Sequence, residues 1–458
     1  PLMPDRRSLV LGGALLSMFL AAMEGTVVTT AMPTMVASLG GIQMYSWVFS
    51  AYLLTSTVSM PLWGRLSDLL GRRRIALVGL GVFLLGSALS GSAQSMAQLV
   101  TFRALQGIGA GSLITLGYIL VGALYSLEQR ARLQGVISGV WGIASILGPF
   151  VGGLLADHAS WRWVFYVNLP FGVPAALAIG FGLNEPPPAR KTLAVDYRGA
   201  LLFTGMVTSL LLGLVEGGRG ASWWTSSVMG LLALAGVLLV AGLMVERRAA
   251  EPLIPLDLFL NRMVRAAAAT GFLAGMAMFG AIAYVPLYVQ GVMGTSATEA
   301  GSVLLWFSLG WLVFSIIGAR LVLRVGYRSV VVAGMTSLVL CLLLLAGLTP
   351  TSTTLTVALD LTLGGCGMGL VFPPMLIAVQ TAVPKRELGS ATSLTQFFRS
   401  IGGAVGVSVM GAVMAHRLQS ALGLPGRLGG NDVAERLHEL IRRPGAQATA
   451  LQALGPAR

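Results

Sequence analysis

Charged side chains are scarce in this chain of 458 residues and make up only 10% of it. Soluble globular chains carry about a quarter charged residues, so the composition excludes a water-soluble fold. Apolar residues make up 55% of the chain, and the mean hydropathy is +0.81. The net charge of +13 does not indicate a nucleic-acid partner, because the basic residues lie mostly between long apolar runs, where they report membrane orientation.

Residue types that serve enzyme chemistry are also few. The two cysteines, Cys341 and Cys366, lie inside apolar runs, and we expect them to be inert packing residues without a disulfide. The two lysines, Lys191 and Lys385, do not follow glycine as a phosphate-binding loop requires. The three histidines form no metal-binding pair within an apolar run. These absences argue against a membrane-embedded enzyme, a metal site, a cofactor and an ATP-driven pump.

Apolar runs long enough to cross a bilayer, which takes about 20 residues, dominate the chain. The first follows Arg6 and Arg7 but is longer than the apolar core of a signal peptide, so we expect an uncleaved span. We predict an all-α integral membrane protein with thirteen spans, at roughly 9–33, 46–63, 75–93, 97–123, 133–155, 164–183, 199–215, 223–245, 264–290, 301–319, 329–348, 354–379 and 391–414.

Arginines between the runs predict the orientation. Alternate connectors hold clusters such as the one at 72–74, whereas the opposite short loops hold only Arg162 and Arg219. This bias predicts a multi-pass protein of the cytoplasmic (inner) membrane with a cytoplasmic N-terminus. An odd number of spans leaves an external polar tail, and a fourteenth span is expected but absent from this sequence.

The connectors predict two six-helix halves separated by an inserted pair. Three successive prolines, Pro186 to Pro188, mark a linker between them. The predicted segments are an N-terminal half at 8–183, a cytoplasmic linker at 184–196, an inserted two-helix hairpin at 197–245, a cytoplasmic connector at 246–263, a C-terminal half at 264–415 with five visible spans, and the tail at 416–458.

Two connectors are similar to one another. Residues 64–74 read GRLSDLLGRRR, and residues 318–328 read GARLVLRVGYR, with the aspartate lost and one glycine shifted. Repeated halves are typical of a secondary transporter that binds its substrate between them, near the middle of the membrane.

Three motifs carry a resemblance to a known family, the major facilitator superfamily. The signature loop of that family is matched by Gly64, Asp68, Gly71, Arg72 and Arg73. Its second motif is matched by Leu99, Arg103, Gln106, Gly107, Gly109 and Ala110, and its antiporter motif by Gly148, Pro149, Gly152 and Gly153. The segment 161–170 (WRWVFYVNLP), the inserted pair and the glycine-rich run 402–406 resemble the fourteen-helix drug:proton antiporter, or multidrug efflux, branch.

Two carboxylates, Glu24 and Asp360, lie well inside predicted spans. An ionised carboxylate there costs several kcal/mol unless it is neutral, paired or functional. Glu24 lies about 22 Å along its span and Arg103 about 9 Å from the outer end of the fourth, so both fall in one outer layer. We interpret Glu24 as the proton-coupling residue, where the related branch usually has aspartate, and Arg103 as its partner. A permanent ion pair is the alternative.

Other residues receive roles from their position or from the resemblance. Asp360 is interpreted as a second proton site or as a site that attracts a cationic substrate, with a wet external vestibule as the alternative. We expect Arg399 to be anchored by backbone carbonyls or lipid phosphate. By resemblance, the loop around Asp68 closes the cytoplasmic side, and Gly148 with Pro149 lets the fifth helix bend. A solvated turn and ordinary helix packing are the respective alternatives.

Aromatic side chains and methionines predict an adaptable substrate cavity, although core or lipid-facing positions are open for each of them. The candidates are Trp141, Tyr284, Tyr288, Trp306, Trp311, Met276 and Met278. We predict a monomeric secondary transporter, surrounded by membrane lipids, that exchanges protons for small lipophilic or cationic compounds, with the proton gradient as its energy source. Export of a lipid or another endogenous amphiphile, and a non-transporting receptor on the same scaffold, remain open.

Overall fold

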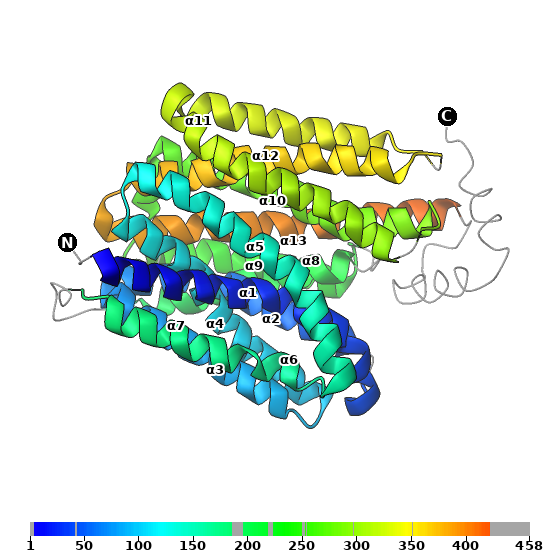
Figure 1. Cartoon of the computed structure of the whole chain (residues 1–458), viewed down its shortest axis with the longest axis horizontal. Helices are drawn as coiled ribbons and strands as arrows, with labels where there is room; N and C mark the ends of the chain where they lie inside the picture. The colour runs from blue at the N-terminus through cyan, green and yellow to red at the C-terminus, as the bar shows by residue number, and fades with distance from the viewer. Residues whose placement is uncertain are drawn as a thin grey trace.

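A computed structural model describes residues 4–41, 44–185, 196–218, 223–249, 252, 254–295, 297–349 and 351–421. Within these residues every regular element is a helix, and the helices run side by side along the longest axis of the molecule (Figure 1). The first group is α1 (Pro4–Leu39), α2 (Tyr45–Leu70), α3 (Arg72–Ser92), α4 (Met96–Leu124), α5 (Leu127–His158), α6 (Trp163–Tyr166) and α7 (Asn168–Gly182). Then follow α8 (Tyr197–Gly218), α9 (Ser226–Glu246), η2 (Leu256–Leu260), α10 (Arg262–Gly291), α11 (Ala297–Ala346), α12 (Thr354–Ala382), η3 (Lys385–Glu387) and α13 (Leu388–Ala421).

Side-chain caps set the starts of several helices. The hydroxyls of Ser95 and Ser126 accept hydrogen bonds from backbone N–H groups in the first turns of α4 and α5, and Asn261 caps α10 in a similar way. The first N–H groups of a helix have no partner within the helix. These caps therefore stabilise helix ends that would otherwise leave backbone groups unpaired.

Eleven helices of the described part are long and apolar enough to cross a membrane. α11 counts once among them, although it contains a break at Gly326, where φ is 79°. Gly71, between α2 and α3, also has a positive φ of 92°. The two similar connectors thus both turn at a glycine in a backbone conformation that other residues avoid.

The predicted run 46–63 lies in α2, which is not among the eleven candidate spans. Polar side chains interrupt this helix, and they bond to the backbone of α4. Thr55 donates to the Ala104 carbonyl at 2.8 Å, and Ser59 donates to the Ile108 carbonyl at 3.1 Å. Because these hydroxyls are satisfied within the bundle, the polar face of α2 packs against α4.

The predicted run 164–183 is divided between two helices. α6 ends at Tyr166, and α7 begins at Asn168 after a turn at Val167. Pro170 lies in the first turn of α7, where its missing N–H leaves no helical hydrogen bond unmade. Val167 keeps right-handed helical backbone angles (φ −60°, ψ −22°), so Trp163–Gly182 still forms one candidate span, and the Asn168 side chain within it is 0% exposed.

The ends of two predicted segments differ from the helices or are not described. α13 continues to Ala421, past the predicted end at 414. The polar tail beyond Ala421 lies outside the described residues, as does the stretch 186–195 of the predicted linker.

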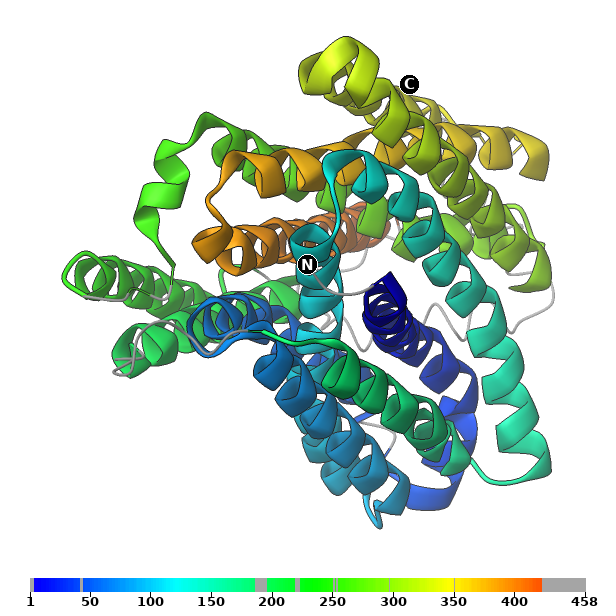
Figure 2. The same ribbon diagram turned by 60° about the vertical axis from the view of Figure 1, so that its left-hand side comes forward.

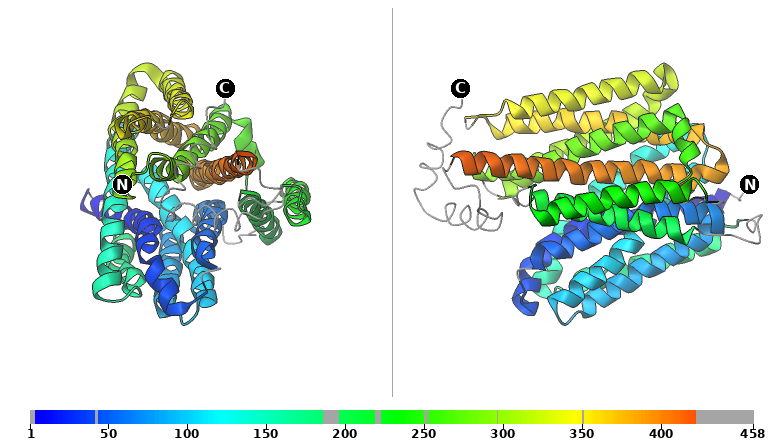
Figure 3. Two further views of the ribbon diagram at one scale, coloured as in Figure 1. Left: turned by 90° about the vertical axis from the view of Figure 1, so that its right-hand side faces the viewer. Right: turned by 180° about the vertical axis from the view of Figure 1, so that it is seen from behind.

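The α8–α9 pair lies at the edge of the bundle (Figure 2). Seen from behind, it lies in front of α13 (Figure 3). Val58 of α2, Val207 of α8 and Ile401 of α13 share one buried cluster. The rings of Phe203 on α8 and Phe397 on α13 are 5.3 Å apart. α8 therefore covers the boundary between the first group of helices and α13, while apolar side chains such as Val237 on α9 are 65% exposed, as suits a surface facing lipid.

Candidate functional site

Glu24 on α1 is fully buried, at 0% exposed. Its Oε1 accepts a hydrogen bond from Arg103 Nη1 on α4 at 2.5 Å, and its Oε2 accepts one from Asn168 Nδ2 on α7 at 2.7 Å. The structure thus brings together the predicted pair Glu24 and Arg103. A buried ion pair requires such additional hydrogen bonds to offset the loss of water.

The guanidinium of Arg103, whose side chain is only 1% exposed, has further partners. Its Nη1 also donates to Gln106 Oε1 at 2.8 Å, and its Nε donates to the Val48 carbonyl at 3.4 Å. The Tyr52 ring lies beneath it, with 4.1 Å between the guanidinium carbon and the ring centroid. The positive charge is therefore stabilised by contacts that do not involve Glu24.

Ser87 on α3 connects the remaining members of this network. Its hydroxyl accepts hydrogen bonds from Gln106 Nε2 at 3.2 Å and from Asn168 Nδ2 at 2.9 Å, and it donates to the Phe165 carbonyl at 2.8 Å. Asn168 Oδ1, in contrast, is buried without a partner. Such a group is costly, and it leaves a free acceptor on the side chain that contacts the Glu24 carboxylate.

Ser87 and Asn168 have no role predicted from the sequence. Asn168 entered only as a letter in the segment 161–170. The available signal was a polar side chain inside an apolar run. That signal does not say which polar residues meet, because the contact joins positions 144 residues apart.

Another face of α1 packs against α5. A Cβ added to Gly148 would lie 1.9 Å from Thr26 Oγ1, and one added to Gly152 would lie 2.1 Å from Thr30 Oγ1 and 2.4 Å from the Val27 carbonyl oxygen. These two positions of the antiporter motif therefore let the helices approach closely, as small residues do in membrane bundles. The helix that carries Glu24 is thereby in direct contact with α5.

Gly153, a third position of the antiporter motif, does not take part in this close contact. A Cβ added to Gly153 would have nothing within 4 Å. α5 continues as a helix through Pro149. The close contact with α1 therefore belongs to Gly148 and Gly152.

Asp68, beyond the predicted span 46–63, joins α2 to α13. Its Oδ1 accepts from the Gly389 N–H at 2.8 Å, and its Oδ2 accepts from the Ser390 N–H and hydroxyl at 2.8 and 3.0 Å. Burial raises the pKa of the Asp68 carboxyl to about 6, although the hydrogen bonds from Ser390 and Gly389 lower it. An open contact would return the carboxyl to water, where an aspartate pKa is about 3.9. The closed contact binds more protons, so a fall in pH below about 6 stabilises it.

Further contacts between the two groups of helices lie at the same end of the bundle. Arg72 Nη2 donates to the Lys385 carbonyl at 3.1 Å, and Gln380 Nε2 donates to the Tyr118 carbonyl at 3.1 Å. Gly64 packs so tightly on α13 that a Cβ would have no room. We call the contacts of Gly64, Asp68 and Arg72 with residues 385–393 the loop-end contact.

The remaining signature positions lie beside the loop-end contact. Gly71 forms the turn into α3, and the Arg73 backbone N–H donates to Glu185 Oε2 at 3.0 Å. The structure therefore brings the whole signature loop to the boundary between α2, α3 and the segment before α13.

Asp360 on α12 is 7% exposed and belongs to the second group of helices. In the described part of the chain, no hydrogen bond or ion pair joins it to Glu24 or Arg103. The two buried carboxylates are therefore separate sites rather than one pair.

Two of the four predicted aromatic cavity residues, Trp141 and Tyr288, pack against the same central apolar cluster. Trp141 is half-buried and packs against the central apolar cluster that contains Tyr118. Tyr284 and Tyr288 donate their hydroxyls to backbone carbonyls of α13 and of the segment after α11. Trp306 is 47% exposed. Neither of the two cavities described below is lined by these four side chains, and their role in a substrate cavity stays a prediction.

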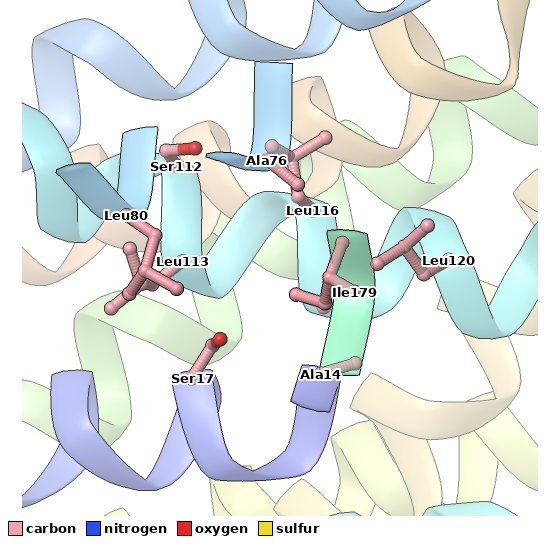
Figure 4. A pocket seen from close by; sticks show the side chains of 10 residues that line it. Ala14, Ser17, Ala76, Leu80, Ser112, Leu113, Leu116, Leu120 and Ile179 are labelled. Atoms are coloured by element: carbon pink, nitrogen blue, oxygen red, sulfur yellow. The ribbon is translucent and has the colours of Figure 1, made fainter. Parts of the chain in front are cut away.

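Two cavities differ greatly in size. One, of about 310 Å³, lies beside the loop-end contact and is lined by Arg72, Arg130 and Lys385 among others. The other, of about 10 Å³, lies between α1, α3, α4 and α7, where Ser17 and Ser112 are its polar lining (Figure 4). It has room for about one water molecule and is too small for a substrate.

The structure has a buried charged network inside a bundle of membrane-length helices, and its two helix groups are joined at one end. These features define a multi-pass membrane protein of the transporter class. A family model of the Major Facilitator Superfamily matches residues 14–407. The chain belongs to this superfamily, which is a family of transporters and not of enzymes.

Characterised relatives cover most of the chain. Multidrug transporter protein MdtP of Bacillus subtilis (strain 168) is 41% identical over 415 residues, which are 90% of this chain and 76% of the relative. Multidrug resistance protein 3 of the same organism is 34% identical over 404 residues, 88% and 79% of the two chains. Efflux pump FUS6 of Gibberella moniliformis (strain M3125 / FGSC 7600) is 32% identical over 417 residues, which are 89% of this chain and 74% of the relative.

Solved structures share the fold. The human organic anion transporter MFSD10 (TETRAN) superposes with a TM-score of 0.67 at 19% identity, over 96% of this chain and 99% of that one. The proton:xylose symporter XylE superposes with a TM-score of 0.61 at 13% identity, over 98% of this chain and 94% of that one. At these identities the likeness establishes the all-helical membrane fold alone.

Replacement of Gly152 by alanine is expected to destabilise the protein. The added Cβ would meet the Val27 carbonyl oxygen at 2.4 Å, and overpacking of this kind costs roughly 1–3 kcal/mol. The purified Gly152→Ala variant should unfold at a lower temperature than the native chain. Its neighbour Gly153→Ala is the control, because open space and the helix preference of alanine, roughly 1 kcal/mol, should leave its unfolding temperature unchanged or raised. Equal unfolding temperatures for the two variants would contradict the close α1–α5 contact.

Proposed function

We propose that this chain is a secondary transporter that exports lipophilic compounds in exchange for protons by alternating access. The observation that carries the proposal is the Glu24 carboxylate, which is fully buried and paired with Arg103. A charged carboxylate in hydrocarbon is costly unless its surroundings compensate it. A movement that separates Glu24 from Arg103 would remove this compensation, and the carboxylate would then take up a proton.

The network suits both protonation states of Glu24. When Glu24 is neutral, Arg103 still has the Gln106 amide oxygen, the Val48 carbonyl and the Tyr52 ring as partners. Asn168 donates its Nδ2 to the charged carboxylate, whereas its Oδ1 has no partner. If the amide rotates, Oδ1 becomes the acceptor that a protonated carboxyl requires. Asn168 is therefore a positioning residue for the proton.

The contacts of α1 connect this site to movement of the helices. Gly148 and Gly152 hold α5 directly against the helix that carries Glu24. α5 in turn contacts α11 in the second group, where Gly135 packs on Ile316. A shift of α1 on protonation would therefore be transmitted to the boundary between the two groups.

We further propose that the loop-end contact closes the cytoplasmic side, as the arginine bias predicts. The N-terminus and residues 64–74 would then face the cytoplasm, in a protein of the cytoplasmic membrane. The proposed topology has thirteen spans, with two passes within α11, one pass shared by α6 and α7, and α8–α9 inserted between the halves of the fourteen-helix branch.

The names of the relatives support small drug-like molecules as substrates, since two are multidrug proteins and one is an efflux pump. The predicted role of Asp360 as a second proton or substrate site, and the predicted aromatic cavity, remain predictions. Export of a lipid would be favoured instead if efflux did not depend on the proton gradient.

The Glu24→Gln variant is expected to lose efflux driven by a pH gradient while it still binds substrate. Glutamine keeps the shape of the side chain but cannot exchange a proton. Inverted membrane vesicles would be energised, and transport of a neutral lipophilic dye, such as Nile red, would be followed by fluorescence. Native vesicles should transport the dye, and the variant should fall to the level of vesicles without the protein. Undiminished gradient-driven transport by Glu24→Gln would falsify the proposed coupling.

Loss of stability must be separated from loss of coupling, because removing one partner of a buried pair costs roughly 3–5 kcal/mol. The double variant Glu24→Gln, Arg103→Gln leaves no unpaired charge. It should unfold at a higher temperature than Glu24→Gln and still be inactive in the transport assay. Recovery of gradient-driven transport in the double variant would show that the single substitution acted through folding.

Removal of the Asn168 amide is expected to change the environment of the protonated Glu24 carboxyl. Infrared difference spectra between acidic and alkaline pH would detect its C=O stretch, identified by its absence in Glu24→Gln. In Asn168→Leu this band should shift to a higher frequency, because the carboxyl has lost its hydrogen-bond partner. Ser87→Ala is the control, since it removes a neighbour of Asn168 but leaves the Glu24 contact. An identical band in the native chain and Asn168→Leu would argue against the role of Asn168.

A further inference from the structure

Arg399 is a second arginine buried inside the bundle, with 6% of its surface exposed. It lies eleven residues after the start of α13 at Leu388, or about 16 Å along the helix. Its Nη2 donates to Gln396 Oε1 at 3.1 Å, and the guanidinium carbon lies 4.6 Å from the centroid of the Phe372 ring. The charge therefore lies at middle depth, in contact with an aromatic ring and an amide.

Arg399, unlike Arg103, has no carboxylate partner among the described residues. In the described residues no carboxylate lies within 4 Å of the Arg399 guanidinium, whereas Arg103 is paired with Glu24. Arg399 Nε is buried without a hydrogen-bond partner, and so is Gln396 Nε2. An unpaired charge and two unsatisfied donors are costly in a buried site. All three groups would be stabilised by a bound, negatively charged group that accepts hydrogen bonds.

The surroundings place this site at the boundary between the two groups of helices. Phe372, beneath Arg399, lies on α12, and its ring centroid is 6.0 Å from that of Tyr118 on α4. Asp360 is twelve residues before Phe372 on α12, or about 18 Å along the helix. It is therefore too far away to neutralise the guanidinium.

Two structural explanations for Arg399 do not agree with these contacts. Anchoring by backbone carbonyls was expected, but in the described part the guanidinium hydrogen-bonds only to the Gln396 side chain. Contact with lipid phosphate is also disfavoured, because the side chain is buried about 16 Å from the end of its helix, beyond the reach of a side chain that extends to the membrane surface.

We infer that Arg399 and Gln396 form a subsite for the anionic group of an amphipathic substrate, such as a lipophilic carboxylate. The inference rests on the proposed transport function and specifies its substrate class. The anionic group accepts hydrogen bonds from Arg399 Nε and Gln396 Nε2, and its apolar part lies against the aromatic cluster of Phe372 and Tyr118. A cationic compound would instead meet an unneutralised positive charge, so the subsite favours anions over cations.

Equilibrium binding of two matched probes tests the inference. The full chain is placed in nanodiscs of phosphatidylcholine, and the affinities for pyrenebutyrate and for its trimethylammonium analogue are measured by fluorescence. The native chain should bind the anion more tightly than the cation. Arg399→Gln should weaken anion binding about tenfold or more, because a charge-assisted hydrogen bond is lost, and should leave cation binding unchanged or stronger.

Three further variants make the result specific. Arg399→Lys keeps the charge and should retain most of the anion preference. Gln396→Leu, which leaves the charge in place, should weaken anion binding about threefold without affecting the cation. Arg247→Gln removes the same charge from an exposed position after α9 and should bind both probes as the native chain does. Folding of each variant is checked by its thermal unfolding.

The inference is overturned if anion binding is unchanged in Arg399→Gln, or if both probes weaken equally. If Arg399→Gln does not fold, unchanged anion binding in Gln396→Leu overturns it. Adding phosphatidylglycerol to the nanodiscs distinguishes the source of the anion. If this lipid competes with pyrenebutyrate in the native chain and in Arg399→Lys, which keeps the charge, the anionic group held at the site is a lipid phosphate. Because no gradient is applied, failure of proton-driven efflux would not affect this measurement, and failure of anion binding would leave the Glu24 assay intact.

Discussion

A carboxylate that is fully buried in a membrane bundle must be paired or protonated, and the first seven helices are arranged around this requirement at Glu24. α4 provides Arg103, and α7 provides Asn168 at its first residue. α3 contributes Ser87, which binds the amides of Gln106 and Asn168. Every member comes from the first group of helices, so the proposed proton site is complete without the second group. In the proposed mechanism, coupling to the second group therefore passes through helix movement and not through a shared side chain.

The packing provides routes for that movement. Gly148 and Gly152 leave no space between α1 and α5, so α1 cannot shift without α5. At the end of the bundle, Asp68 binds the first N–H groups of α13, which have no partner within their own helix. These bonds can be broken and re-formed without disrupting either helix. α8 packs on both α2 and α13 next to this boundary, so it covers the line along which the two groups would separate.

The sequence predicted the helical membrane fold and the family, because long apolar runs and motifs at fixed spacing are local signals. It also predicted that Glu24 meets Arg103, since the cost of burying either charge alone favours pairing. It did not predict Asn168 or the unpaired Arg399, because the contacts of a polar residue in an apolar run depend on how helices rotate against one another. Nor did it predict that α2 would fall outside the apolar spans. Hydroxyls such as Thr55 are satisfied by the backbone of α4, and that contact is invisible in a hydropathy pattern.

The two buried arginines together affect the energetics of the proposed exchange. Arg103 is neutralised by Glu24, whereas Arg399 is not neutralised by any described carboxylate. Moving one charge across the membrane is worth about 2.3 kcal/mol for each 100 mV of potential. In a one-for-one exchange of a proton for a cation no net charge moves, and the membrane potential contributes nothing. In a one-for-one exchange of a proton for an anion, the proton moves inward and the anion moves outward. A negative cell interior favours both movements, which adds about 4.6 kcal/mol at 100 mV. A subsite that selects anions would thus let the potential drive both halves of the cycle, and the unpaired charge of Arg399 is the feature on which that advantage depends.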